Sequence, residues 1–176
     1  MAETLREDRL MRFRLWSPLA PLALALAALV FGLDQTSKWW MLNVYGIAGR
    51  QPVEITPFFD LVLTWNQGVS YGLFRTHQQG LLAALSLMVA LILWVWACRA
   101  KAPLTVAALA LIVGGALGNA LDRTVRGAVA DFFHFHLGGF SWYVFNIADV
   151  AIVAGVAVLL YESLAGSGSG KSHGNA

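Results

Sequence analysis

Charged residues are scarce in this chain: of 176 residues, 12% are Asp, Glu, Lys or Arg, whereas 58% are hydrophobic. A soluble domain carries about 25% charged residues, so this composition excludes a water-soluble enzyme. Cysteine occurs once, as Cys98, which excludes an intrachain disulfide. Lys and Arg number only 12 and are scattered, which argues against nucleic-acid binding. With a mean hydropathy of +0.64, the chain is predicted to be a small polytopic membrane protein.

Four stretches approach the roughly 20 apolar residues that a membrane-spanning helix needs, at 15–33, 80–98, 102–121 and 142–161. The fourth is uniformly apolar only from residue 150 onward, and its extension back to Trp142 brings Asp149 into the membrane. We therefore expect a single integral membrane domain over residues 1–165. The sequence GSGSGKSHGNA at 166–176 predicts a flexible tail.

The orientation follows from the positive charges that flank the spans. Seven of them would share the cytoplasmic side and five the outer side, and four of the seven directly precede the first span. The cytoplasmic set is Arg6, Arg9, Arg12, Arg14, Arg99, Lys101 and Lys171, and the outer set is Lys38, Arg50, Arg75, Arg123 and Arg126. Both termini are thus expected in the cytoplasm.

The outer connection over 34–79 is too structured for a linker. Trp39 and Trp40 begin a segment typical of the membrane interface, where Trp and Tyr are enriched. Residues 52–57 and 58–65 are rich in β-branched and aromatic residues and predict a small sheet. The expected fold is an all-α membrane protein with four transmembrane helices, a small extracytoplasmic β-sheet platform and an interfacial helix.

Polar residues gather toward the outer ends of the predicted spans. A charged side chain at mid-bilayer costs on the order of 2.5–3.5 kcal/mol, so polar groups at one level of several helices indicate a shared hydrophilic pocket. Three pairs have helical spacing and would each share a helix face: Asp34 with Lys38, Asn119 with Arg123, and Asn146 with Asp149. Asp122 is expected to form a structural pair with Arg123, and the glycines at 114–118 to serve helix packing.

Five short motifs follow one another between residues 34 and 149. They are Asp34-Gln-Thr-Ser-Lys38, Asn66-Gln-Gly68 followed by Tyr71-Gly72, Gly114-Gly-Ala-Leu-Gly-Asn119-Ala-Leu-Asp122-Arg123, Val129-Ala-Asp131-Phe and Phe145-Asn146-Ile-Ala-Asp149. In this order they resemble the motifs of the lipoprotein signal peptidases (signal peptidase II). One such motif would be weak evidence, whereas five together are specific.

The resemblance implies an intramembrane aspartyl protease of the bacterial inner membrane, with its active site toward the extracytoplasmic face. Its substrates would be prolipoproteins, cut just before a cysteine that carries a diacylglyceryl group. The resemblance implies that Asp131 and Asp149 are catalytic. It assigns supporting or substrate-binding roles to Asp34, Lys38, Asn66, Gly68, Asn119, Arg123 and Asn146.

Two alternatives remain open from the residues alone. Buried Asp, Lys and Arg also occur in proton relays, so a proton-coupled transporter component is possible. His134 and His136 could join Asp131 and Asp149 in a zinc site, although no H-E-x-x-H motif is present. We expect a monomer that contacts membrane lipid and uses no cofactor and no metal.

Overall fold

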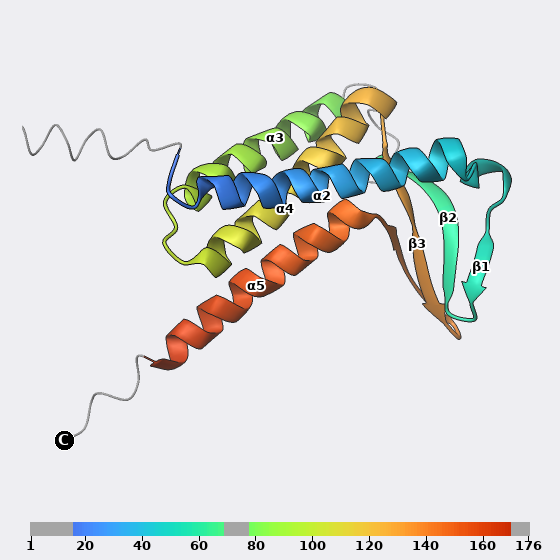
Figure 1. Ribbon diagram of the computed structural model, residues 1–176. Coiled ribbons are helices and arrows are strands. Elements are labelled where there is room, and N and C mark those ends of the chain that lie inside the picture. Colours follow the sequence, from blue (N-terminus) through green and yellow to red (C-terminus); the bar gives the residue numbers. More distant parts are fainter. Residues whose placement is uncertain (1–15, 69–77, 170–176) are drawn as a thin grey trace, which may run out of the picture.

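Four long apolar helices form a bundle in the computed structural model, which describes residues 16–68 and 78–169 (Figure 1). Each is long and apolar enough to cross a membrane. They are α2 (Ala20–Trp39), α3 (Gln78–Ala97), α4 (Pro103–Arg126) and α5 (Ile147–Ser169). A π-helical segment, η2 (Trp40–Val44), and a short 3-10 turn, η3 (Ile47–Gly49), follow α2.

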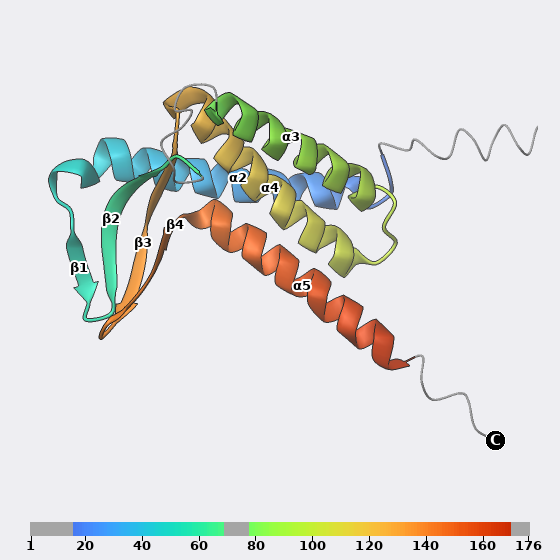
Figure 2. The same ribbon diagram turned by 180° about the vertical axis from the view of Figure 1, so that it is seen from behind.

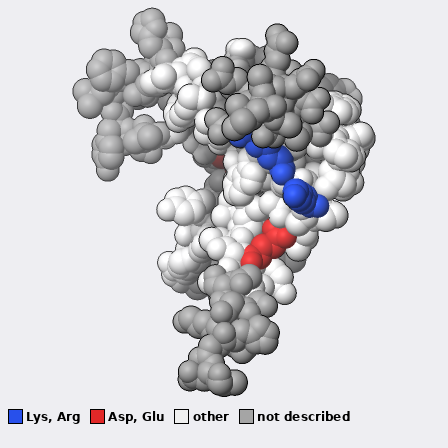
Figure 3. All heavy atoms as spheres, turned by 90° about the vertical axis from the view of Figure 1, so that its left-hand side faces the viewer, with Lys and Arg blue, Asp and Glu red and all other residues white. Residues whose placement is uncertain are grey.

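Helix α4 is the centre of the bundle and packs against the other three helices. In its most apolar stretch 67% of the residues are buried, against 28% in α2 and 17% in both α3 and α5. The three outer helices therefore expose the apolar surface that a lipid environment accepts. The end of the bundle seen in Figure 3, where α3 connects to α4, shows few charged side chains among its described residues.

Glycines allow the close helix contacts, as expected. A Cβ on Gly114 would lie 2.6 Å from the carbonyl oxygen of Ala27 in α2, and one on Gly115 would lie 2.5 Å from that of Ala148 in α5. Gly155 of α5 meets the Ala108 carbonyl in the same way, at 2.5 Å. Small residues at such crossings let helix backbones approach one another.

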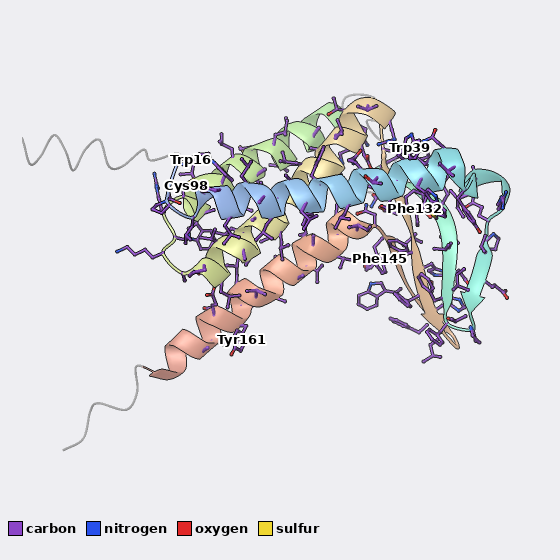
Figure 4. The ribbon with its side chains drawn as sticks, viewed as in Figure 1. Trp16, Trp39, Cys98, Phe132, Phe145 and Tyr161 are labelled. Carbon is purple, nitrogen blue, oxygen red and sulfur yellow. The ribbon has the colours of Figure 1, made fainter. Side chains whose placement is uncertain are left out.

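An antiparallel sheet in the order β1-β2-β3-β4 lies at one end of the bundle (Figures 1 and 2). Its strands are β1 (Val53–Thr56), β2 (Phe59–Asn66), β3 (Val129–Leu137) and β4 (Phe140–Phe145). Met41 and Ile47 pack on Ala130 and Phe132 of β3, so the end of the first helix covers one face of the sheet. Figure 4 shows Phe132 close to the end of α2.

The sequence analysis identified the first two strands and missed the other two. The missed strands, β3 and β4, carry two signals of a hairpin. They are rich in β-branched and aromatic residues, and the turn between them is Gly138-Gly139, with Gly138 at φ +58°. Asp131 thus lies in a strand, and the fourth apolar helix begins at Ile147 instead of Trp142.

Two other boundaries differ. The first helix does not end near residue 33: it includes Asp34 and Lys38 and continues as η2. Helix α5 extends to Ser169, beyond the expected beginning of the tail at residue 166. The remaining tail residues 170–176, the basic residues before 16, and Tyr71, Gly72 and Arg75 lie outside the described residues.

Candidate active site

Asp131 and Asp149 come from two different elements that meet where the sheet joins the bundle. Asp131 is on β3 and is 1% exposed, and Asp149 is in the first turn of α5 and is partly exposed. Strand β4 runs directly into α5, as Figure 2 shows, and so connects the two elements. The hairpin of β3 and β4 therefore brings both carboxyl groups to the end of the bundle where α4 ends and α5 begins.

Asn146 contacts both aspartates. Its Nδ2 donates a hydrogen bond to Asp131 Oδ1 at 2.6 Å. Its Oδ1 accepts from the Asp149 backbone N–H at 3.0 Å, and its own backbone N–H donates to Asp149 Oδ2 at 3.2 Å. This reciprocal pair is a capping box at the beginning of α5, and it confirms that the two residues share a face. Asn146 fixes the orientation of both carboxyl groups.

Asn119 of α4 extends this network to the interior. Its Nδ2 donates to Asp149 Oδ1 at 2.9 Å. Its Oδ1 accepts from Asn146 Nδ2 at 3.2 Å and from Lys38 Nζ at 3.3 Å. Because every polar atom of this buried amide side chain has a partner, its orientation is determined. A continuous set of hydrogen bonds thus links Lys38 to both aspartates.

Lys38 lies at the centre of a buried ionic cluster. It is 0% exposed, and its Nζ lies 2.8 Å from Asp34 Oδ2 and 2.7 Å from Asp122 Oδ2. The expected contact between Asp34 and Lys38 is therefore present. Asp122 also pairs with Arg126, so two cations and two carboxylates compensate one another. Burial of unpaired charges would be far more costly than burial of this compensated cluster.

Asp122 differs from its predicted role. A pair with Arg123 was expected, but Asp122 forms ion pairs with Lys38 and Arg126. Arg123 instead donates to the Asn119 backbone carbonyl at 3.4 Å. Asp122 also accepts a hydrogen bond from Gln35 Nε2 at 3.2 Å. The Asp122–Arg126 spacing of four residues was the available signal for this pair. The contacts of Gln35 with α4 had no signal, because they join residues far apart in the chain.

Asp34 holds the beginning of α5 against α2 and α4. Its Oδ1 accepts the Ala148 backbone N–H at 3.0 Å, one of the N–H groups that a helix leaves without an internal partner. A Cβ on Gly118 would lie 2.5 Å from Asp34 Oδ2, so the missing side chain makes room for this carboxylate. The first motif therefore positions the helix that carries Asp149.

Asn66 and Gly68 lie at the end of β2. Asn66 Nδ2 donates to Asp131 Oδ2 at 3.0 Å, across the strand pair β2–β3. Its Oδ1 accepts from the Gly68 backbone N–H at 2.9 Å and closes a tight turn. Gly68 has φ +83°, and a Cβ there would lie 2.7 Å from Leu82 Cδ1 of α3. Both features favour glycine at this position.

The environment of Asp131 favours its protonated form. Burial, together with the nearby negative charge of Asp149, raises the pKa of Asp131 to about 6. Hydrogen bonds from Asn66 and Asn146 and the positive charge of Lys38 act in the opposite direction. Two carboxyl groups in one site titrate as a pair, and one of them retains a proton to a higher pH than an isolated carboxyl group does.

The zinc alternative that was left open is not assembled at this site. His134 and His136 are three and five positions beyond Asp131 on β3, so their side chains lie on the opposite face of the strand. Both histidines approach Asp60 of β2 instead of the two aspartates.

The comparisons with known proteins agree on one family. The family described as signal peptidase (SPase) II matches residues 26–165. The lipoprotein signal peptidase of Methylocella silvestris is 51% identical over 157 residues, which cover 85% of this chain and 91% of that protein. The lipoprotein signal peptidase of Beijerinckia indica is 49% identical over 147 residues, with 82% and 88% covered.

The fold also has a solved counterpart. A structure titled as a bacterial membrane enzyme superposes with a TM-score of 0.73 at 23% sequence identity, covering 89% of this chain and 95% of that one. The transporter alternative has no support among these relatives. The chain belongs to the signal peptidase II family of membrane proteases.

Proposed function

We propose that this membrane protease removes signal peptides from diacylglyceryl-modified prolipoproteins, with Asp131 and Asp149 as its catalytic pair. The substrate class follows the names of the relatives, which are lipoprotein signal peptidases. The observation that supports the catalytic pair most strongly is the contact of Asn146 with both carboxyl groups. Asp34, Lys38, Asn66, Gly68, Asn119 and Arg123 act as supporting residues.

The reaction requires one protonated and one ionised carboxyl group. Asp149 takes a proton from a water molecule, whose oxygen then attacks the scissile carbonyl carbon. Asp131 gives its proton to the carbonyl oxygen, so a neutral tetrahedral diol forms. Its collapse breaks the C–N bond, and Asp149 transfers its proton to the leaving amine while Asp131 recovers one from the diol. Such reciprocal proton transfer is general acid–base catalysis.

The surroundings support this assignment of the two roles. Asp131 is buried and has a pKa raised to about 6, as suits the group that begins protonated. Asp149 accepts hydrogen bonds from the Asn119 side chain and the Asn146 backbone, and it lies in the first turn of α5. These donors orient the Asp149 carboxyl group for its role as the base.

An apolar groove suits the lipid-modified part of the substrate. It has a volume of about 760 Å³ and lies between α2, α3 and α4. Its lining includes Ala28, Phe31, Leu87, Trp94, Leu117 and Leu121. We assign this groove to the acyl chains, whose contacts with its lining can be used to orient the scissile bond.

The sheet suits a position at the outer membrane surface, with both termini cytoplasmic and the protein in the inner membrane. Strand β3 alternates Phe and His from 133 to 136. The rings of Phe59, Phe133, Phe135 and Phe145 pack together on the face that also carries Asp131. An aromatic face of this kind is typical of the membrane interface. The expected localisation thus places the catalytic pair beside the lipid surface.

The proposal is tested with purified protein and a synthetic prolipoprotein peptide that carries a diacylglyceryl cysteine. Mass spectrometry should identify a product that begins with the lipidated cysteine, and the released signal peptide. Cleavage at another bond, or no cleavage by a folded protein, would contradict the proposed function.

A further inference from the structure

A group of metal-ligating side chains lies on the sheet, outside the catalytic pair. Asp60 of β2 and His134 of β3 are register partners, and His136 follows two positions along β3 on the same face. One ligand atom from each of the three residues lies within 4.8 Å of the other two. The proposed reaction uses none of these side chains.

We infer that Asp60, His134 and His136 bind Zn²⁺ or a similar divalent transition-metal ion. Asp60 Oδ2 lies 2.9 Å from His136 Nε2 and 3.6 Å from His134 Nδ1. Ligand atoms about 2.0–2.1 Å from a tetrahedral Zn²⁺ are about 3.3 Å apart, so both separations are close to those around a shared ion. Two imidazole nitrogens and a carboxylate oxygen also form a ligand set that zinc accepts.

The contact between His136 and Asp60 does not have the geometry of a hydrogen bond. His136 Nε2 is buried and has no hydrogen-bond partner among the described residues, although Asp60 Oδ2 lies within hydrogen-bond distance. The His136 Nε2 atom therefore does not point at Asp60 Oδ2. Two ligand atoms directed at a common ion have this relationship. Asp60 Oδ1 is also buried and without a partner among the described residues.

Ser141 of β4 supplies the outer partner that a metal-binding histidine normally has. His134 Nε2 lies 2.8 Å from Ser141 Oγ. With Nε2–H as the donor, the proton is on Nε2, and the lone pair of Nδ1 is directed toward Asp60. Such outer hydrogen bonds fix the tautomer of a ligating histidine.

The position of the site indicates a structural ion. The side chains of Asp60, His134 and His136 are 13%, 21% and 30% exposed, which leaves one side open for a water ligand. Asp131 lies on the opposite face of β3, so the ion does not reach the catalytic pair. It would instead join β2 to β3, the two strands that carry Asn66 and Asp131.

The test uses untagged full-length protein in detergent, stripped of metal with a chelator and titrated calorimetrically with Zn²⁺. We expect one ion per chain, and a higher Tm with Zn²⁺ than without it. The affinity should fall at least tenfold in Asp60→Asn, His134→Ala and His136→Ala. Asp131→Asn, on the opposite face of β3, is the matched control and should bind Zn²⁺ as the wild type does. Chelation should leave cleavage intact, because the ion is remote from the reacting atoms.

Two results would overturn the inference. One is a wild-type affinity for Zn²⁺ no higher than that of the His134→Ala/His136→Ala double variant. The other concerns Ser141→Ala, which keeps all three ligands and should therefore fold even if a ligand variant does not. Its affinity should be about 10–100-fold lower than that of the wild type. An unchanged affinity would contradict the proposed arrangement. The absorption spectrum of bound Co²⁺ reports four-coordinate geometry independently of the affinity.

Discussion

The side-chain amide of Asn146 donates to the carboxyl group of Asp131 at 2.6 Å while the same residue caps the helix that carries Asp149. One buried side chain thus sets the relative position of a strand residue and a helix residue. Catalysis by two carboxyl groups depends on such fixed geometry, because small displacements of reacting groups have large effects on rate.

The first prediction concerns this residue. Asn146→Ala removes the hydrogen bond to Asp131 and the cap of α5, so we expect kcat to fall at least 100-fold. The helix cap alone contributes about 1 kcal/mol, so thermal unfolding should show a lower Tm as well. Asn43→Ala is the matched control, since the exposed Asn43 donates to the Trp39 backbone carbonyl four residues earlier. Equal kcat values for both variants would contradict the positioning role.

Lys38 provides a test of the buried ionic cluster. Lys38→Met keeps a side chain of similar length but leaves Asp34 and Asp122 buried without this cation. Breaking a buried ion pair costs about 3–5 kcal/mol. We expect a large drop in Tm, measured by unfolding in detergent. Lys101→Met, at an exposed position in the connection between α3 and α4, should change the Tm little. Similar Tm values for the two variants would show that the cluster does not stabilise the fold.

The pH dependence follows from Asp131. Its pKa is raised from 3.8 to about 6, so the protonated acid that the reaction needs is depleted as the pH rises through 6. We therefore expect kcat/KM to fall above about pH 6, and to fall again at low pH, because one carboxyl group of the pair must be ionised. A rate that is constant from pH 5 to pH 9 would contradict this assignment.

The same shift makes a prediction about stability. A carboxyl group whose folded pKa is raised resists ionisation, so the folded state loses stability as the pH rises from about 4 through 6. Asp131→Asn removes this cost, and its free energy of unfolding should exceed that of the wild type at pH 8 by on the order of 3 kcal/mol. The difference should disappear near pH 4. A variant less stable than the wild type at both pH values would be inconsistent with the raised pKa.

The lipid on the substrate should supply much of the binding. We expect an unmodified precursor to be cut at least 100-fold more slowly, as kcat/KM, than the diacylglyceryl form. Ala28→Trp places a large ring in the apolar groove and should reduce this preference. Ala25→Trp, on the same helix outside the groove lining, is the control. Equal rates on both substrates by the wild type would refute the lipid requirement.

The sequence predicted contacts within one element better than contacts between elements. The pairs Asp34–Lys38 and Asn146–Asp149 follow from helical spacing, and both are present. The beginning of α5 was placed too early, because an aromatic strand and the first turns of an apolar helix look alike in composition. The two signals that distinguish them, alternation of Phe with His and a Gly-Gly turn, lie in the hairpin itself.

Contacts between distant residues had no such signal. Asn119 forms hydrogen bonds with Lys38, Asn146 and Asp149 because α4 is central in the bundle. The residues next to Asn119 in the sequence do not predict these partners. Asp122 Oδ2 likewise lies 2.7 Å from Nζ of Lys38 in α2. The gathering of Asp60 with His134 and His136 depends on the register of β2 and β3, which composition does not determine.

Single-turnover cleavage of a diacylglyceryl prolipoprotein by Asp131→Asn and Asp149→Asn tests the central claim most directly. Asparagine keeps the shape of each side chain and removes its exchangeable proton. We predict folded proteins, verified by thermal unfolding, in which each single variant and the double variant have almost no cleavage, because residues that act as a unit are not additive. Asp122→Asn should lose stability or some rate and still cleave. Substantial cleavage by a folded Asp131→Asn or Asp149→Asn protein would contradict the two-aspartate mechanism.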